Sequence, residues 1–315
     1  MSSVLITGAA GFLGRRLLKE LIAEGHIGGK PIRRIVLADV HPAACSVSTE
    51  IDVSVRQGDL SDRGFVKSLS AEGFDTLFHM ASLLTLQAET DPSFAYKVNV
   101  EALRTLMELA QNRPTVIFTS SIAIHGGVLP EEVDDDCNPV PATTYGTHKA
   151  INELLIADYS RLGRIDGRSL RLPIVLTRPG APAPAVSDQV AAIVREPLKG
   201  MDVDVLLSPE TLVPIVSAGA VVRALLRLHD VSSDRLPPKR ALNLPALSVT
   251  VAELTEAAAR HGGLGRVTYK PDPGVQAIVD GWPRRFVSRR AAGLGLGPDA
   301  DLDALILDYL HNKDD

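Results

Sequence analysis

The sequence predicts an α/β fold in which a doubly wound parallel sheet of the Rossmann type is joined to a smaller, mostly C-terminal domain. Strand-like and helix-like segments alternate from residue 3 to about residue 178. A glycine-rich turn joins the first strand to the first helix. After residue 180, proline becomes frequent and the alternation ends. Strands are therefore expected at 3–7, 34–38, 52–56, 75–79, 115–119 and 168–175, and long helices at 94–111 and 145–162.

The first turn carries the spacing G-x-x-G-x-x-G, formed by Gly8, Gly11 and Gly14. Gly8 permits the sharp turn, Gly11 lets the backbone approach a pyrophosphate, and Gly14 lets the helix pack closely on the strand. The phosphates would bind the N–H groups at the start of the helix, where Phe12 and Leu13 lie. A plain tight turn is the alternative, but its place between a strand and an amphipathic helix favours a dinucleotide site.

Residues at the ends of the next strands indicate which dinucleotide binds. Asp39 ends the strand at 34–38, where its carboxylate can accept hydrogen bonds from the ribose hydroxyls of NAD and would repel the 2′-phosphate of NADP. A solvated residue at the strand end is the alternative reading. Asp59, after the third strand, is expected near the adenine amino group. Further residues expected to contact the cofactor are Leu60, Met80, Ala81 and Ser82.

A candidate catalytic group combines Tyr145 and Lys149 with Ser121 at the end of the strand near 115–119. A Tyr four residues before a Lys is weak evidence alone, because Tyr309 and Lys313 repeat the spacing in a C-terminal segment where both are expected to be solvated. At 145–149 the spacing places the ammonium one helical turn from the phenol. The context of the first pair, beside a dinucleotide site, decides between them.

The abstraction of a hydroxyl proton requires a base, and a free phenol with a pKa of about 10 is a poor one at neutral pH. We expect the positive charges of Lys149 and of a nicotinamide ring to lower the pKa of Tyr145 and make it the base. Ser121 would orient the reacting oxygen. Ser120 should face the other side of the strand and be structural, because successive side chains alternate.

Composition excludes several classes of function. The net charge of −5 and the lack of a basic cluster argue against nucleic acid as a partner. Two cysteines, Cys45 and Cys137, do not form a disulfide framework. No apolar stretch approaches the roughly 18 residues that span a bilayer, and no signal peptide is recognisable. We expect a cytoplasmic protein that does not associate with membranes, with a small-molecule substrate and no metal.

These residues together resemble the extended short-chain dehydrogenase/reductases over essentially the full length of the chain. The resemblance rests on motifs in family order: the glycine turn, Asp39, Asp59-Leu60, His79-Met80-Ala81, Asn99, Ser120-Ser121, Tyr145-x-x-x-Lys149 and Arg171-Leu172-Pro173. It implies that Lys149 holds the nicotinamide ribose, that Asn99 braces the active-site backbone, and that Leu172, Pro173 and Ile174 line the cofactor. For Asn99, a place on the helix surface is the alternative.

Within that family the chain resembles the D-erythronate dehydrogenase group. Supporting stretches include Phe118-Thr119-Ser120-Ser121, Arg195-Glu196-Pro197-Leu198 and Gly281-Trp282, whereas Pro214-Ile215-Val216-Ser217 and Pro283-Arg284-Arg285 depart from it. The resemblance implies an oxidoreductase that transfers a hydride from the 2-hydroxyl of a small sugar acid to NAD and gives the 2-keto acid. A nucleotide-sugar epimerase with the same Ser, Tyr and Lys is the alternative. A non-catalytic NAD-binding module and an NADPH-dependent carbonyl reductase fit less well.

The substrate residues are less constrained by the sequence. Arg178 could bind a substrate carboxylate as a bidentate fork, or pair with an acid such as Asp188. Ser82 and His125 could contact substrate hydroxyls, or be satisfied loop residues. We expect residues 1–179 to form the NAD-binding domain, to which part of 205–245 returns, and 180–315 to be mainly substrate-binding. Two long helices side by side would suit a homodimer.

Overall fold

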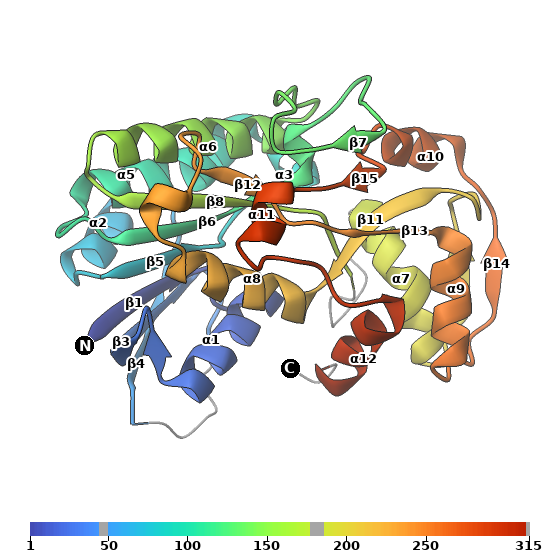
Figure 1. Cartoon of the computed structure of the whole chain (residues 1–315), viewed down its shortest axis with the longest axis horizontal. Coiled ribbons are helices and arrows are strands. Elements are labelled where there is room, and N and C mark those ends of the chain that lie inside the picture. The colour runs from blue at the N-terminus through green and yellow to red at the C-terminus, as the bar shows by residue number, and fades with distance from the viewer. Residues whose placement is uncertain (44–49, 177–185, 313–315) are drawn as a thin grey trace. The chain divides into compact units, whose positions relative to one another are not determined.

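The computed structural model describes residues 1–43, 50–176 and 186–312, and the chain divides into two compact units (Figure 1). The first unit comprises Met1–Ile124, Thr143–Arg171 and Leu225–Leu242. The second comprises His125–Ala142, Leu172–Ala224 and Asn243–Asp315. Each unit is thus assembled from separate stretches of the chain.

The first unit is built on the main sheet, which among the described residues has eight strands in the order β12-β8-β6-β5-β1-β3-β2, with β4 paired to β3. Their bounds are β1 Ser2–Thr7, β2 His26–Ile27, β3 Lys30–Asp39, β4 Asp52–Gln57, β5 Thr76–His79, β6 Thr115–Ser121, β8 Asp166–Leu172 and β12 Ala241–Asn243. β1 pairs in parallel with both β3 and β5, and the pairs β3–β4 and β5–β6 are parallel too. The predicted doubly wound sheet is confirmed.

The strand order reverses at β1. β3 and β4 lie on one side of it, and β5, β6 and β8 lie on the other. Crossover connections leave β1 and β5 in opposite directions, so the loops after these two strands separate and leave room for a ligand at the carboxyl ends of the strands. The glycine turn follows β1, and Met80 follows β5. The topology therefore places two predicted cofactor segments at the point where such folds bind dinucleotides.

Helices cover both faces of this sheet. Figure 1 shows α2, α5 and α6 on one face and α1 on the other. Leu5, Leu77 and Phe118 of the strands share one buried cluster with Leu106 of α5 and Ile156 of α6, as alternate strand positions pointing to one side require. The helices of this unit are α1 Phe12–Glu24, α2 Arg63–Ala71, α3 Thr85–Thr90, α4 Pro92–Tyr96, α5 Ala102–Leu109 and α6 Thr144–Arg161, with a short 3-10 turn at Ile122–Ile124 and another at Ser233–Arg235.

The helix expected at 94–111 differs from the prediction. It begins two residues earlier, at Pro92, and between α4 and α5 it widens into a π-helical turn, Lys97–Glu101. Asn99 lies in the middle of that turn. Such π turns insert an extra residue into the i→i+4 pattern and are frequent at functional sites.

The second unit has its own core and its own small sheets. Its buried cluster includes Ile174, Ile193, Leu254 and Leu305. The strands are β7 Glu132–Val133, β9 Ile174–Leu176, β10 Val203–Val205, β11 Leu212–Ser217, β13 Leu247–Thr250, β14 Val267–Tyr269 and β15 Arg285–Phe286. The helices are α7 Val186–Leu198, α9 Val251–Arg260, α10 Pro273–Asp280, α11 Arg289–Gly293 and α12 Leu302–Asn312, while α8 Ala218–Asp230 contributes to both units.

Two expectations are corrected here. The strand expected at 168–175 is divided, because β8 ends at Leu172 and β9 begins after Pro173 in another sheet, paired to β11. Proline lacks the N–H that would continue the ladder. Tyr309, expected on a solvated terminal helix, is only 5% exposed and packs inside the second unit. Lys313 lies outside the described residues.

Candidate active site

The glycine turn has no room for side chains. Gly8 has φ +74°, and a Cβ there would lie 2.6 Å from the backbone nitrogen of Ala81. A Cβ on Gly14 would lie 2.4 Å from the carbonyl oxygen of Gly8. Gly11 is the N-cap of α1, and no side chain caps its N–H groups. Close backbone approach and an uncapped helix start are what a pyrophosphate requires, so these residues fit the phosphates of NAD.

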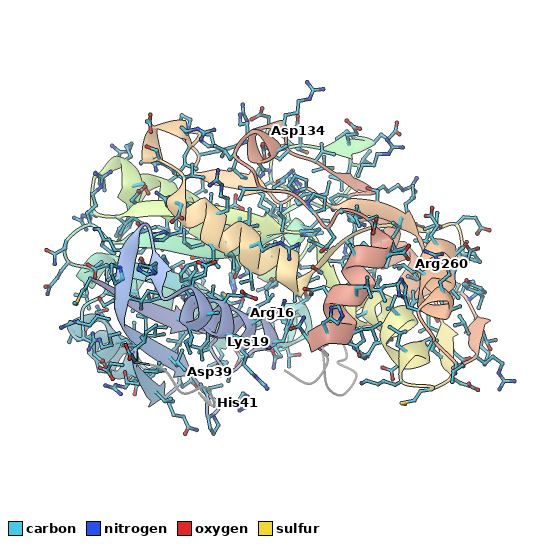
Figure 2. The ribbon with its side chains drawn as sticks, turned by 60° about the horizontal axis from the view of Figure 1, so that its bottom comes forward. Arg16, Lys19, Asp39, His41, Asp134 and Arg260 are labelled. Carbon is cyan, nitrogen blue, oxygen red and sulfur yellow. The ribbon has the colours of Figure 1, made fainter. Side chains whose placement is uncertain are left out.

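Asp39 lies at the end of β3 and supports the same turn (Figure 2). Its Oδ2 accepts a hydrogen bond of 2.9 Å from the backbone nitrogen of Ala10, and its Oδ1 accepts one of 2.9 Å from that of His41. The carboxylate is therefore held in place by backbone donors while it remains partly exposed. This fits a residue that presents fixed acceptor oxygens to a ribose.

The other predicted adenine and backbone contacts follow strands of the same sheet. Asp59 follows β4, and its Oδ1 accepts from the backbone nitrogen of Ser61 at 2.8 Å. Leu60 is buried in the cluster between the sheet and its helices. Met80 donates its N–H to the carbonyl oxygen of Thr7 at 3.1 Å, which holds the end of β5 beside the end of β1.

Tyr145 lies in the first turn of α6, whose N-cap Thr143 accepts from the backbone nitrogen of Gly146 at 3.0 Å. The phenol forms a hydrogen bond with the hydroxyl of Ser121, which favours the ionised form. Burial acts more strongly in the opposite direction and raises the pKa of Tyr145 to about 12. The expectation of a lowered pKa is therefore not met in the protein without cofactor.

Lys149 lies one helical turn further along α6 and is 3% exposed. Its Nζ donates to the carbonyl oxygen of Thr119 at 2.7 Å and lies 5.4 Å from the centre of the Tyr145 ring. Burial lowers the pKa of Lys149 to about 7, against the opposing negative charge of Glu153. The ammonium is thus beside the phenol, and it has lost much of its preference for the charged form.

Asn99 is 3% exposed, so the helix-surface alternative is wrong. Its Oδ1 accepts from the backbone nitrogen of Leu83 at 2.8 Å and from Ser82 Oγ at 3.2 Å, and its Nδ2 donates to Leu83 O at 3.0 Å. Its own carbonyl oxygen accepts from Asn152 Nδ2 at 2.6 Å. Asn99 thus joins α6 to the loop after β5.

The site contains one charged pair that sequence reasoning did not find. Arg171, expected to be a structural strand residue, donates from Nη2 to Glu153 Oε2 at 2.8 Å, and Ser120 donates to Glu153 Oε1 at 2.5 Å. All three residues are at most 5% exposed. Glu153 could have been identified from its spacing, because it follows Lys149 by four residues, as Lys149 follows Tyr145.

The remaining predicted residues lie outside this group. His125 belongs to the second unit, where it is buried against the ring of Phe286. Leu172 ends β8, and Ile174 begins β9. Arg178 lies outside the described residues. Asp188, suggested as its partner, accepts from Arg195 at 2.9 and 3.1 Å within the second unit.

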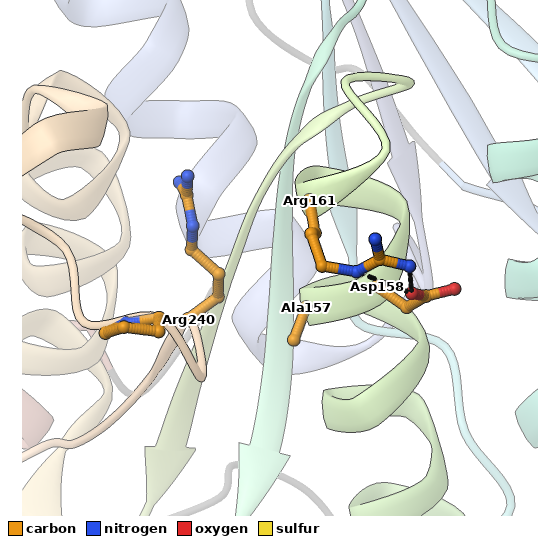
Figure 3. A pocket seen from close by; sticks show the side chains of 5 residues that line it. Ala157, Asp158, Arg161 and Arg240 are labelled. Atoms are coloured by element: carbon orange, nitrogen blue, oxygen red, sulfur yellow. Dashed lines mark hydrogen bonds and ion pairs between the residues drawn. The ribbon is translucent and has the colours of Figure 1, made fainter.

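A surface hollow lies elsewhere in the first unit. It has a volume of about 430 Å³ and is lined by Ala157, Asp158, Arg161, Pro238 and Arg240 (Figure 3). These α6 residues lie more than two helical turns beyond Lys149. Because it contains none of the predicted catalytic residues, we do not assign the reaction to it. Among the described residues, no cluster of His, Cys, Asp or Glu could hold a metal ion, and none of the described helices could cross a membrane.

Comparison with known proteins identifies the family of this chain. A family model described as the NAD dependent epimerase/dehydratase family matches residues 4–244. D-erythronate dehydrogenase of Cupriavidus necator is 40% identical over 98% of this chain and 98% of its own length. The protein of that name from Haemophilus influenzae is 36% identical, again over 98% of both chains.

A solved structure has a closely similar fold. The chain is similar to a crystal structure described as a nucleoside-diphosphate-sugar epimerase from Agrobacterium tumefaciens, with a TM-score of 0.93 and 33% identity over 99% of this chain and 94% of that one. The fold, the glycine turn and the Ser, Tyr and Lys constellation are thus found together in a chain that such relatives match from end to end. The chain belongs to the NAD dependent epimerase/dehydratase family and is an NAD-dependent dehydrogenase of the extended short-chain dehydrogenase/reductase type.

Proposed function

We propose that this dehydrogenase oxidises the 2-hydroxyl of a small sugar acid, D-erythronate or a close relative, to the 2-keto acid. The observation that carries the proposal is the grouping of Ser121, Tyr145 and Lys149 at the end of β6 and the start of α6. Further support comes from two relatives named D-erythronate dehydrogenase that match the chain over 98% of its length.

The residues of the glycine turn would hold NAD, with its pyrophosphate on the N–H groups of Phe12 and Leu13 and its adenosine ribose on Asp39. Lys149 would donate to the hydroxyls of the nicotinamide ribose, because its ammonium has three donors and Thr119 takes one. NAD, when bound, supplies the acceptor for the hydride that leaves the substrate carbon. Asn99 would keep the loop at Ser82 in position.

Tyr145 would take the hydroxyl proton while Ser121 donates a hydrogen bond to the same substrate oxygen. Because burial raises the pKa of Tyr145 to about 12, the free protein holds little phenolate at neutral pH. Positive charge brought close to the phenol favours its ionisation, and Lys149 lies beside it. We therefore propose that cofactor binding completes the activation of Tyr145.

The substrate carboxylate needs a cationic partner, and we propose Arg178, because Arg171 is already engaged by Glu153. Ser82 and His125 are proposed to contact substrate hydroxyls.

We also propose a homodimer formed through α5 and α6, since Leu109 and Leu154 on these helices are 43% and 73% exposed. Analytical ultracentrifugation of the wild type and of Leu154→Glu tests the dimer.

The proposed function is tested by following NADH formation with D-erythronate and with other aldonic acids of about four to six carbons. The wild type should reduce NAD with D-erythronate. Tyr145→Phe should lose at least about 100-fold in kcat, which is the usual cost of removing a general base. Tyr159→Phe is the matched control, because Tyr159 lies on the same helix but donates to Glu108, away from the site. Near-normal turnover by Tyr145→Phe would contradict the assignment of the base.

A nucleotide-sugar epimerase is the second candidate. It is favoured by the similarity to the Agrobacterium tumefaciens structure described as a nucleoside-diphosphate-sugar epimerase. An epimerase uses the same residues but returns the hydride to the intermediate. Isomerisation of a nucleotide sugar with no net formation of NADH, and no turnover of aldonic acids, would favour this function over the first.

A further inference from the structure

The carboxylate of Glu153 connects α6 to two strands of the main sheet. It accepts hydrogen bonds from Ser120 of β6 at 2.5 Å and from Arg171 of β8 at 2.8, 3.0 and 3.2 Å. β6 and β8 are neighbours in the sheet. Glu153 is 5% exposed, so these contacts replace the water that a carboxylate would otherwise bind. The bidentate geometry with arginine fixes the direction of the carboxylate.

The contact with Ser120 belongs to a series. Three consecutive residues of β6 each bond to α6, at positions one helical turn apart. The bonded pairs are Thr119 O with Lys149 Nζ, Ser120 Oγ with Glu153 Oε1, and the hydroxyls of Ser121 and Tyr145. A shift of α6 along the strand would break all three contacts together. The register of helix against strand therefore determines where the phenol and the ammonium lie.

Glu153 also supplies a charge. Lys149 and Glu153 are four residues apart on α6 and are both buried. Burial lowers the pKa of Lys149 to about 7, and the negative charge of Glu153 opposes that fall. The other titratable groups that act on this pair are Tyr145 on α6, His79 on β5 and Arg171 on β8. Of these groups, His79 and Tyr145 are uncharged at neutral pH, because burial lowers the pKa of one to about 3 and raises that of the other to about 12.

We propose that Glu153 is a positioning residue for the dehydrogenase reaction: its carboxylate holds the register of α6 against β6 and favours the ammonium form of Lys149. The inference rests on the proposed function only in that Lys149 serves NAD and Tyr145. A buried ion pair that serves folding alone would change the free energy of unfolding and leave the titration of Lys149 unaltered.

The decisive measurement is the titration of Lys149 in the full-length protein without substrate. Lysine labelled with carbon-13 at Cε reports protonation by NMR, and Lys149→Met identifies the signal. In Glu153→Gln, which preserves the shape of the side chain, the midpoint should fall by about one pH unit. Glu153→Asp keeps the charge, so the midpoint in this variant should lie close to the wild-type value. A midpoint that stays at the wild-type pH in folded Glu153→Gln overturns the proposal.

The control variant is Asp166→Asn. Asp166 also lies on β8 and also binds buried arginine, but its partners are Arg168 and Arg240. Its removal should destabilise the protein and leave the Lys149 midpoint at the wild-type value, and an equal fall in this variant would overturn the inference.

If Glu153→Gln does not fold, the double variant Glu153→Met with Arg171→Met replaces both charges by apolar groups. Its Lys149 midpoint should still lie below that of the wild type, and a midpoint at or above it overturns the proposal.

Kinetics separate this inference from the proposed function. If kcat/KM for sugar-acid oxidation falls at high pH as Lys149 loses its proton, that fall should occur at lower pH in Glu153→Gln than in the wild type. A wild type that oxidises no sugar acid, together with a shifted Lys149 midpoint, refutes the substrate and supports the role of Glu153. Sugar-acid turnover with an unshifted midpoint supports the substrate and refutes the role of Glu153.

Discussion

Lys149 Nζ donates a hydrogen bond of 2.7 Å to the carbonyl oxygen of Thr119. The same nitrogen lies 4.6 Å from the centre of the Phe118 ring and 5.4 Å from that of Tyr145. A long flexible side chain is thereby held in one position by β6 before any ligand arrives, so little rotamer entropy remains to be lost on binding. Because the ammonium is buried, it lowers the free energy of unfolding. This loss should appear as a dependence of stability on pH.

Removal of this buried ammonium should stabilise the protein near neutral pH. Burial lowers the pKa of Lys149 from 10.5 to about 7. Between those values the unfolded chain binds the proton and the folded protein does not, so wild-type stability rises as the pH rises. Lys149→Met should exceed the wild type by about 2–5 kcal/mol in free energy of unfolding at pH 7, and this gap should shrink toward pH 10. Urea unfolding at both pH values tests this, and a gap independent of pH contradicts it.

His79 should make the protein sensitive to acid. Burial, together with the positive charge of Lys149, lowers the pKa of His79 from 6.5 to about 3. As the pH falls through this range the unfolded chain gains a proton that the folded protein excludes, so stability falls. Between about pH 6 and pH 4 the wild type should lose roughly 3 kcal/mol more than His79→Asn. The control is His26→Asn, because His26 is exposed, and an equal loss in the wild type and His79→Asn contradicts the prediction.

Much of the site could be predicted from the sequence because its signals are local. The glycine turn lies between one strand and one helix, and the spacing from Tyr145 to Lys149 is one turn of a single helix. Asp39 ends a strand whose apolar run is evident in the sequence. Each pattern depends on neighbours within a few residues, so periodicity and spacing were sufficient to place it.

The missed features depend on pairing across the fold. Glu153 binds Arg171, 18 residues away on β8. The residues around either position do not indicate that the two side chains pair. Tyr309 is buried because α12 packs within the second unit, which its terminal position does not indicate. The π turn around Asn99 leaves no mark in helix periodicity. The raised pKa of Tyr145 likewise follows from burial, which the sequence does not specify.

Gly14 should tolerate no side chain. A Cβ would lie 2.4 Å from the carbonyl oxygen of Gly8 and 2.7 Å from Cα of Ala9, and these are backbone atoms that cannot move aside independently. Gly14→Ala should lower stability by about 1–3 kcal/mol and weaken NADH binding at least about tenfold. Thermal unfolding and NADH fluorescence titration measure the two effects. In the control Gly293→Ala the added Cβ meets nothing within 4 Å, and equal effects in both variants would contradict the steric argument.

Asp39 should determine the preference for NAD over NADP. Both carboxylate oxygens are fixed by backbone donors, the N–H of Ala10 and that of His41, each at 2.9 Å. A 2′-phosphate on the adenosine ribose would face this fixed negative charge. Asp39→Asn removes the repulsion and keeps one acceptor oxygen, so the ratio of kcat/KM for NAD to that for NADP should fall by about 10- to 100-fold, equivalent to roughly 1.4–2.7 kcal/mol.

The ratio is the informative quantity, because Asp39 also supports the glycine turn through Ala10 and the variant should use both cofactors less well in absolute terms. Asp62→Asn is the control. Asp62 follows the next strand, where it caps α2 by accepting from the backbone nitrogen of Gly64 at 2.7 Å. That change removes a carboxylate and weakens a helix cap, so it should reduce stability but leave the ratio unaltered. An unchanged ratio in Asp39→Asn would mean that selectivity resides elsewhere in the chain and that the carboxylate serves only to hold the turn.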